Sequence, residues 1–189
     1  MIIQLRGASG SGKTWVVQQL MERYKFNPVK DRKNEIKGYY CKELNLFLVG
    51  KYETPTGGCD TINQNSQNRI CKRIEKATSK GWNVLFEGLI CSHIAARYAD
   101  LYKHMTDDGI RVKYIFLDTT LEKCRQNINT RRAKKGKPPI QAKNTEKDYT
   151  STHRSRENMK NMGVPNKDMP LLSSTEAYYH ILKWLKKNQ

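Results

Sequence analysis

The residues best suited to chemistry lie close to the amino terminus. The segment Gly7-Ala8-Ser9-Gly10-Ser11-Gly12-Lys13-Thr14 has the pattern GxxxxGK[ST]. Its glycines let consecutive backbone amides turn inward around phosphate oxygens, with no Cβ atom in the way. In such a loop Lys13 reaches the β- and γ-phosphates, and the hydroxyl of Thr14 ligates Mg²⁺. The whole segment is therefore predicted to bind a nucleotide with Mg²⁺. We expect ATP, because Asn166-Lys167-Asp168 is followed by Met169 where a guanine-selecting tetrapeptide has aspartate.

Two carboxylates are candidates for the rest of the chemistry. Glu87 follows the apolar run 84–86, and an acid at the end of a buried strand is where such proteins hold Mg²⁺ through water. Asp60 follows a glycine pair at the junction of a loop and a helix. It could accept the proton of an attacking hydroxyl, or it could simply cap the helix. Which of the two carboxylates is the general base stays open at this point.

Arginines on a later segment could complete the site. Arg125, Arg131 and Arg132 precede Gly136 and the proline pair 138–139, which end a predicted helix. Arginine forks match phosphoryl oxygens in pairs of hydrogen bonds. We predict that Arg125 binds the nucleotide and that Arg131 and Arg132 stabilise the transferred group, on a lid around residues 120–162. The competing interpretation is a charged helix end that faces solvent.

The composition restricts the class of protein and its partners. Of 189 residues, 35 are Lys or Arg and 18 are Asp or Glu, giving a net charge of +17. Such a surface attracts polyanions, so nucleic acid is the leading partner. The mean hydropathy is −0.81, with no long apolar run, which predicts no membrane span. The start lacks a secretory pattern, and five cysteines without a CxxC pair favour a reducing cytoplasm over a disulfide or zinc framework. The oligomeric state is left open.

The candidate residues must be positioned by alternating strands and helices. Hydrophobic periodicity predicts strands at 1–6, 39–41, 46–49, 83–86, 112–117 and 169–172. It predicts helices at 13–24, 63–80, 92–107, 119–135, 145–162 and 175–187, the fourth with a capping box from Thr119 to Glu122. This alternation predicts one α/β domain over 1–189 with a mostly parallel, three-layer sheet and ligands beyond the strand ends.

Basic residues gather in three segments outside the predicted core, at 30–37, 131–137 and 153–160. The first belongs to a basic insertion around 25–51, of which 25–38 is predicted to be a loop. A flexible basic rim above a nucleotide cleft suits a polymer, whose phosphates extend beyond the reacting atom. We therefore predict that the three segments form one rim.

Several stretches together resemble a known family. They are IQLRGASGSGKT near the start, YETPTGGCDTI at 52–62, VLFEGLICS at 84–92, FLDTTLEKCRQNINTRRAKKGKPP at 116–139, and residues 144–154. In these the chain resembles the 5-hydroxymethyluracil DNA kinases of bacteriophages, which are P-loop kinases. The resemblance implies transfer of the ATP γ-phosphoryl group to the 5-hydroxymethyl group of a modified pyrimidine in DNA, within the cytoplasm of a bacterial host. Asp60 would match the hydroxyl-activating aspartate of related kinases, although 25–51 separates it from the loop by more chain than is usual.

Two other functions fit the same residues. A deoxynucleoside monophosphate kinase shares the loop, the lid and the size, but its phosphate acceptor needs no general base. A module that binds DNA in an ATP-dependent way, without transferring phosphoryl groups, would use the loop and the positive charge alone.

Overall fold

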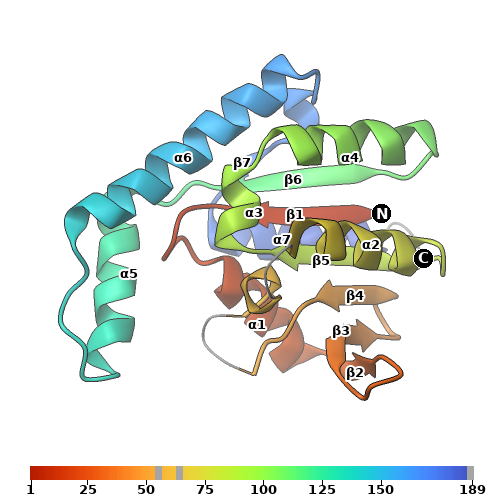
Figure 1. The fold of residues 1–189 in the computed structure, drawn as a ribbon, viewed down its shortest axis with the longest axis horizontal. Helices are drawn as coiled ribbons and strands as arrows, with labels where there is room; N and C mark the ends of the chain where they lie inside the picture. Colours follow the sequence, from red (N-terminus) through yellow and green to blue (C-terminus); the bar gives the residue numbers. More distant parts are fainter. Residues whose placement is uncertain (54–56, 63–65, 187–189) are drawn as a thin grey trace.

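The computed structural model describes residues 1–53, 57–62 and 66–186. A seven-stranded sheet with the order β2-β3-β4-β5-β1-β6-β7 forms the centre of the molecule (Figure 1). The strands from β4 to β7 in this order pair in parallel, whereas β2, β3 and β4 pair antiparallel. The strands are β1 (Ile2–Arg6), β2 (Asn27–Lys30), β3 (Ile36–Cys41), β4 (Leu46–Val49), β5 (Asn83–Glu87), β6 (Val112–Leu117) and β7 (Leu171–Leu172).

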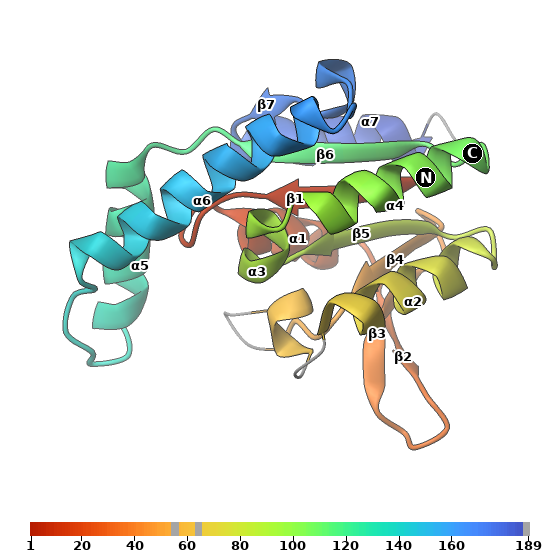
Figure 2. The ribbon, with the colours of Figure 1, turned by 45° about the horizontal axis from the view of Figure 1, so that its top comes forward.

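Helices cover both faces of this sheet. The α-helices are α1 (Lys13–Arg23), α2 (Ser66–Thr78), α3 (Leu89–His93), α4 (Ala96–Asp107), α5 (Leu121–Ala133), α6 (Ala142–Asn161) and α7 (Ser174–Lys186); short 3-10 turns are η1 (Cys59–Thr61) and η2 (Asn166–Asp168). Helices α1 and α7 pack on one face, and α2, α4 and α6 on the other (Figure 2). None of the helices in these described ranges is long and apolar enough to cross a membrane.

The central strands are buried on both sides, as their continuous apolar runs require. Along β5, Val84 and Phe86 join the core under α2 and α4, while Leu85 between them joins the core under α1 and α7. Every residue of β1 and β5 is buried. The prediction of a three-layer, mostly parallel α/β fold is therefore confirmed, and the strand at 112–117 has the predicted bounds. That 1–189 is a single domain stays a prediction.

The prediction of a loop at 25–38 is wrong. Strands β2 and β3 form a hairpin that extends the sheet at its edge, so the basic insertion at 25–51 is built from β2, β3 and β4. The side chain of Asp31 closes the hairpin by accepting hydrogen bonds from the amides of Lys33 (2.9 Å) and Glu35 (3.0 Å). Asn34 adopts a left-handed turn conformation with φ of 62°. The exposed β2 is an edge strand, which needs no apolar pattern, and periodicity therefore misses it.

The helix predicted at 92–107 is divided into α3 and α4. Ile94, between them, has extended backbone angles (φ −89°, ψ 120°). The side chain of Arg6 is fully buried. Its guanidinium donates to the carbonyls of Ser92 (2.9 Å) and Ile94 (2.8 Å) and to the Ser155 hydroxyl (2.5 Å). These bonds satisfy carbonyls at the break that a continuous helix would have used itself. Arg6 is the last residue before the glycine loop, and it thereby links the start of this loop to α3 and α6.

Other predicted boundaries shift by a few residues. Thr120, and not Thr119, caps α5, because its hydroxyl accepts a hydrogen bond from the Lys123 amide (3.3 Å). Helix α6 begins at Ala142, ahead of the predicted 145. Gly81, with φ of 72°, ends the α2 region in the left-handed conformation that favours glycine. The predicted start of that helix at 63–65 lies outside the described residues.

Candidate active site

The glycine loop is fixed from inside by its own lysine. It connects β1 to α1, as predicted. The buried Nζ of Lys13 donates to the carbonyls of Gly7 (2.8 Å) and Ala8 (2.9 Å), and burial lowers the pKa of this ammonium. Gly10 and Gly12 have φ of 81° and 101°, in the left-handed region that favours glycine. The loop therefore encloses a cation where the phosphates of a nucleotide are expected.

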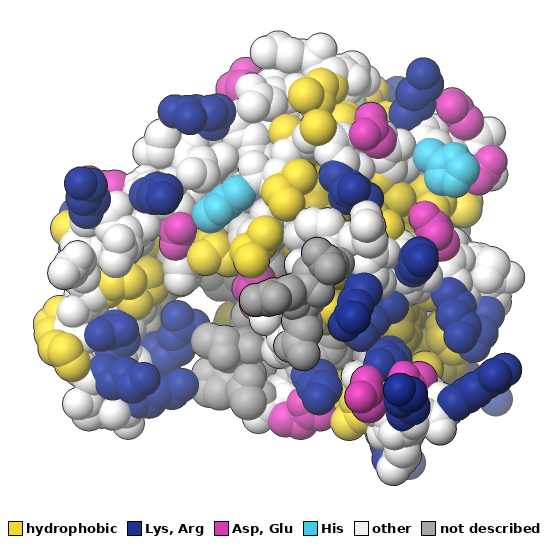
Figure 3. All heavy atoms as spheres, viewed as in Figure 1, with side chains coloured by type: hydrophobic (Ala, Val, Ile, Leu, Met, Phe, Trp, Pro, Cys, Tyr) yellow, Lys and Arg dark blue, Asp and Glu magenta, His cyan; other side chains and the backbone are white. Residues whose placement is uncertain are grey.

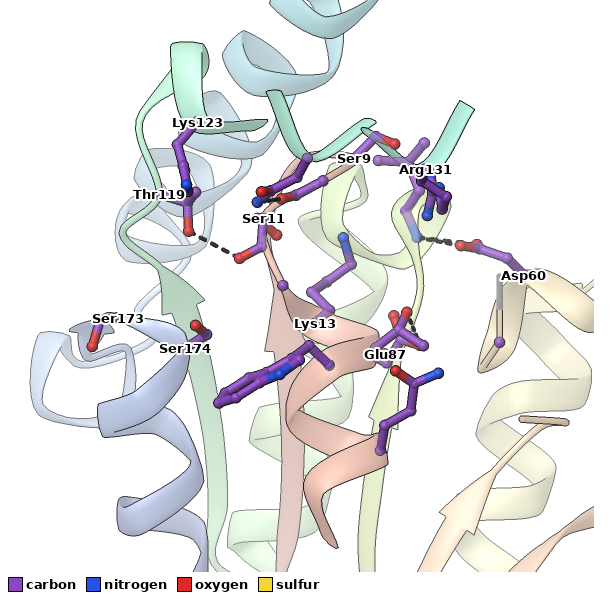
Figure 4. Close-up of a pocket in the computed structure, with 18 of the residues that line it drawn as sticks. Ser9, Ser11, Lys13, Asp60, Glu87, Thr119, Lys123, Arg131, Ser173 and Ser174 are labelled. Carbon is purple, nitrogen blue, oxygen red and sulfur yellow. Dashed lines mark hydrogen bonds between the residues drawn. The ribbon is translucent and has the colours of Figure 1, made fainter. Parts of the chain in front are cut away.

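Helix α5 fixes the same loop from outside. Asn127 donates to the Gly10 carbonyl (2.8 Å), and the Thr119 hydroxyl before α5 donates to the Ser11 carbonyl (2.9 Å; Figure 4). A Cβ atom on Gly10 would lie 2.4 Å from the backbone oxygen of Cys124, so only glycine lets the two elements approach this closely. The first helix of the predicted lid is thus in direct contact with the nucleotide loop.

Glu87 lies beside the start of α1. The Thr14 hydroxyl donates to its Oε1 (3.2 Å), and only 1% of Glu87 is exposed. Burial raises the pKa of this carboxyl to about 7, although nearby Lys13 opposes the shift. A Cβ atom on Gly58 would lie 2.4 Å from Glu87 Oε1, so the glycine at 58 is what allows η1 to pass over this carboxylate. A hydroxyl and a carboxylate in contact suit Mg²⁺, which binds through few protein oxygens, phosphates and waters.

Asp60 on the η1 turn is exposed, and it lines the same cleft as Glu87. The Leu89 amide at the start of α3 donates to both of its oxygens (2.8 and 3.0 Å). Asp60 therefore anchors α3, an arrangement that neither sequence interpretation of this residue anticipates. Since a single amide occupies one edge of the carboxylate, acceptor capacity remains for a substrate hydroxyl.

These residues line one cleft of about 1000 Å³. Figure 4 shows Lys123, Ser173 and Ser174 on one side of the loop, and Asp60 and Glu87 on the other. Figure 3 shows the hollow between α5 and the remainder of the molecule. The lining residues are Ser9, Gly10, Ser11, Gly12, Lys13, Thr14, Trp15, Gln18, Gly57, Asp60, Glu87, Leu89, Ile90, Asp118, Thr119, Thr120, Lys123, Asn127, Arg131, Ser173 and Ser174.

The three predicted arginines lie in different surroundings. Arg131 lines the cleft. Arg125 instead forms an ion pair with Glu146 of α6, and Arg132 donates to the Pro138 carbonyl (2.5 Å). Neither belongs to the residues that line the cleft, and the roles assigned to all three stay predictions.

Sequence reasoning missed other polar residues of the cleft. Lys123 and Asn127 precede the predicted Arg131 at intervals of about one helical turn, so the three residues form one face of α5. This four-residue spacing could have identified the face from the sequence, but the more numerous basic residues nearby obscured it. Ser173 and Ser174 follow β7, at the carboxyl edge of the sheet, where the fold brings the ends of parallel strands together. The described residues contain no cluster of three or more His, Cys, Asp or Glu side chains suited to a metal ion.

A glycine loop between the first strand and the first helix of a parallel sheet, with a buried lysine and a strand-end acid, defines a P-loop kinase fold. Residues 2–152 match the protein family described as AAA domain. The chain belongs to this family of P-loop proteins and is a phosphotransferase.

Three curated phage proteins are similar to the chain. The 5-hmdU DNA kinase of Pseudomonas phage PaMx11 is 33% identical, over 97% of this chain and 96% of that protein. The 5-hmdU DNA kinase 1 of Salmonella phage ViI is 26% identical, over 67% of this chain and 57% of that protein. The 5-hmdU DNA kinase of Bacillus phage SP10 is 22% identical, over 89% of this chain and 26% of that protein. The first similarity covers both proteins almost completely, and it confirms the resemblance to the phage kinases.

Proposed function

We propose that the chain transfers the γ-phosphoryl group of ATP to the 5-hydroxymethyl group of 5-hydroxymethyluracil in DNA. The observation that carries this proposal is one cleft that holds a phosphate-binding loop and, opposite it, an exposed carboxylate, Asp60. A hydroxyl acceptor needs such a base, whereas a phosphate acceptor does not. The names of the phage relatives and the net charge of +17 support DNA as the carrier of that hydroxyl.

On the donor side, the residues bind and orient a triphosphate. Magnesium-bound ATP, when present, supplies the transferable phosphoryl group, with charge neutralised by the metal. The backbone amides of the glycine loop and the Lys13 ammonium hold the phosphate oxygens. Thr14 and Glu87 would hold the metal. Arg131 faces the cleft from α5 and stabilises the charge that spreads over the transferred group.

On the acceptor side, Asp60 is better suited than Glu87 to receive the proton. Glu87 is buried and accepts a hydrogen bond from Thr14, and its raised pKa is a consequence of that burial. Asp60 is exposed at the cleft and is held in place by the Leu89 amide. In the reaction the acceptor oxygen forms a bond to the γ-phosphorus, its proton passes to Asp60, and ADP leaves with the electron pair of the broken P–O bond.

The size of the cleft fits two ligands. About 1000 Å³ is at the upper end of ligand pockets, so donor phosphates and one acceptor base can enter together. A base in duplex DNA must leave the stack to reach Asp60, or be presented in a single strand. The predicted lid at 120–162 would close over the donor through α5 and α6. We place the reaction in the cytoplasm of a phage-infected bacterium, where the DNA acceptor is found.

Mass spectrometry of nucleosides tests the proposal. DNA that carries 5-hydroxymethyldeoxyuridine is incubated with the protein, ATP and Mg²⁺, digested to nucleosides and analysed. We expect 5-phosphomethyldeoxyuridine, and no product from matched DNA that carries thymidine. Phosphorylation of the free nucleoside or monophosphate, with none on DNA, would overturn the proposal.

A further inference from the structure

Helix α2 has a continuous basic stripe on its outer side. At about 100° per residue, its cations fall within roughly 100° of the helix circumference, away from the buried residues Ile70, Ile74 and Ala77. Glu75, the one acid of the helix, lies outside the stripe. The stripe is formed by Arg69, Lys72, Arg73 and Lys76.

The stripe continues onto the hairpin of β2 and β3. Arg73 donates to the Lys37 carbonyl of β3 (2.9 Å), so helix and hairpin are in contact. A hollow of about 130 Å³ between them is lined by cations from both, with the Lys80 ammonium 4.5 Å above the Trp82 ring. Asp31 is the acid in this hollow and is paired with Lys37 (2.8 Å). We call this surface the α2 basic face; it consists of Lys30, Lys37, Arg69, Lys72, Arg73, Lys76 and Lys80.

This face lies beyond the acceptor side of the cleft. The turn η1, which holds Asp60, precedes α2 in the chain, while α5 lies at the opposite end of the molecule from α2 (Figures 1 and 2). Figure 3 shows Lys and Arg side chains gathered over α2 and the hairpin. The hairpin and the end of α5 lie on opposite sides of the molecule, so the basic segments 30–37 and 131–137 are not adjacent, and their membership of one rim stays a prediction. A strand that enters at Asp60 can continue along α2.

The spacing of the stripe fits a nucleic-acid backbone. With a rise of about 1.5 Å per residue, Arg69 and Lys76 are separated by about 10 Å along the helix axis. One DNA strand carries a charge about every 3.4 Å of duplex axis, so this length matches about three phosphates. The α2 stripe contains no acid and can neutralise such a row of phosphates, while Lys37 at the edge of the face is paired with Asp31 and Glu35.

We propose that the α2 basic face binds the sugar-phosphate backbone of DNA next to the acceptor nucleotide. This inference rests on the proposed function, because it assigns the surface that would bind the DNA on either side of the acceptor base. It also predicts that the enzyme distinguishes long DNA from a short acceptor by affinity, while the chemistry at Asp60 is the same for both.

A matched pair of charge variants tests this face. One variant carries Arg69→Gln, Lys72→Gln and Lys76→Gln, and the control removes the same charge at the exposed Lys103, Lys167 and Lys183. Binding of fluorescein-labelled, unmodified DNA is measured by anisotropy between about 50 and 200 mM salt, since phosphate contacts give affinity a salt dependence. Phosphorylation is measured on a long oligonucleotide and on a trinucleotide that each carry 5-hydroxymethyldeoxyuridine. Circular dichroism checks that both variants are folded.

For the α2 variant we expect about tenfold weaker DNA binding and a log–log salt slope smaller by about two to three. We also expect the ratio of kcat/KM on the long substrate to that on the trinucleotide to fall about tenfold, and the control to change neither. An unaltered salt slope, or equal losses of DNA affinity in variant and control, would overturn the proposal that the α2 basic face binds DNA. If the unmodified protein binds DNA through this face but phosphorylates neither substrate, the proposed function fails and the binding surface stands.

Discussion

The two sides of the cleft are held in place in different ways. On the donor side, Lys13 bonds the loop carbonyls from within and α5 bonds them from outside, through Asn127. On the acceptor side, Asp60 stands exposed on a short 3-10 turn and is held by the Leu89 amide. The elements proposed to bind phosphate are therefore built into the core of the fold. In the proposed function the acceptor is instead bound by surface elements outside that core.

The largest effect is expected on the donor side. Lys13→Met removes the buried ammonium that meets the phosphates, so we expect kcat/KM to fall about a thousandfold. Steady-state transfer from labelled ATP measures it. Lys123→Met is the matched control, because Lys123 lines the same cleft from α5 without contacting the loop carbonyls. An equal loss in the two variants would show that the loop has no special part in donor binding.

The buried carboxyl on the same side gives a pH test of stability. The pKa of Glu87 is raised from 4.5 to about 7 in the folded protein, so the folded state keeps a proton that the unfolded chain releases. The stability from this proton is complete below pH 4.5 and is lost as the pH rises through about 7. Relative to Glu87→Gln, the free energy of unfolding should therefore fall by about 3 kcal/mol over that range.

Urea denaturation without nucleotide, at several pH values between these limits, measures the difference. Parallel pH profiles for the two proteins would show that the folded state does not raise the pKa of Glu87.

The acceptor side is tested by Asp60→Asn. The amide oxygen can still accept from the Leu89 amide, so α3 keeps its anchor while the general base is lost. We expect kcat on 5-hydroxymethyluracil DNA to fall about a hundredfold with little change in ATP affinity. Quenched-flow transfer and nucleotide titration separate the two quantities. A variant weakened only in substrate binding, with normal kcat, would indicate a phosphate acceptor. It would contradict the assignment of Asp60 as the general base.

The smallest effect on kcat is expected for two neighbouring arginines of α5. Arg131 lines the cleft, whereas Arg132 bonds the Pro138 carbonyl. We expect Arg131→Met to lower kcat about tenfold and Arg132→Met to leave it within about twofold. The same transfer assay measures both. A larger loss for Arg132→Met would support the sequence prediction that both arginines act on the transferred group.

The donor side could be predicted from sequence because it depends on local patterns. The spacing of Gly7, Gly12 and Lys13 specifies both the turn and the chemistry, and the apolar run before Glu87 specifies a buried strand. The acceptor side depends on contacts between distant segments. The bond from the Leu89 amide to Asp60 joins η1 to α3, and no pattern within either segment predicts it. The edge strand β2 was missed for a related reason, since exposed residues carry no periodicity.

A single-turnover experiment tests most directly whether the two sides act on one reaction. Protein in excess is mixed rapidly with γ-labelled ATP, Mg²⁺ and DNA that carries 5-hydroxymethyldeoxyuridine, and the label is followed in DNA and in free phosphate. We expect the label to enter DNA in one exponential phase, slowed about a hundredfold in Asp60→Asn while ATP binding is unchanged. Label that appears only as inorganic phosphate, at the same rate with and without the hydroxymethyl group, would contradict the account.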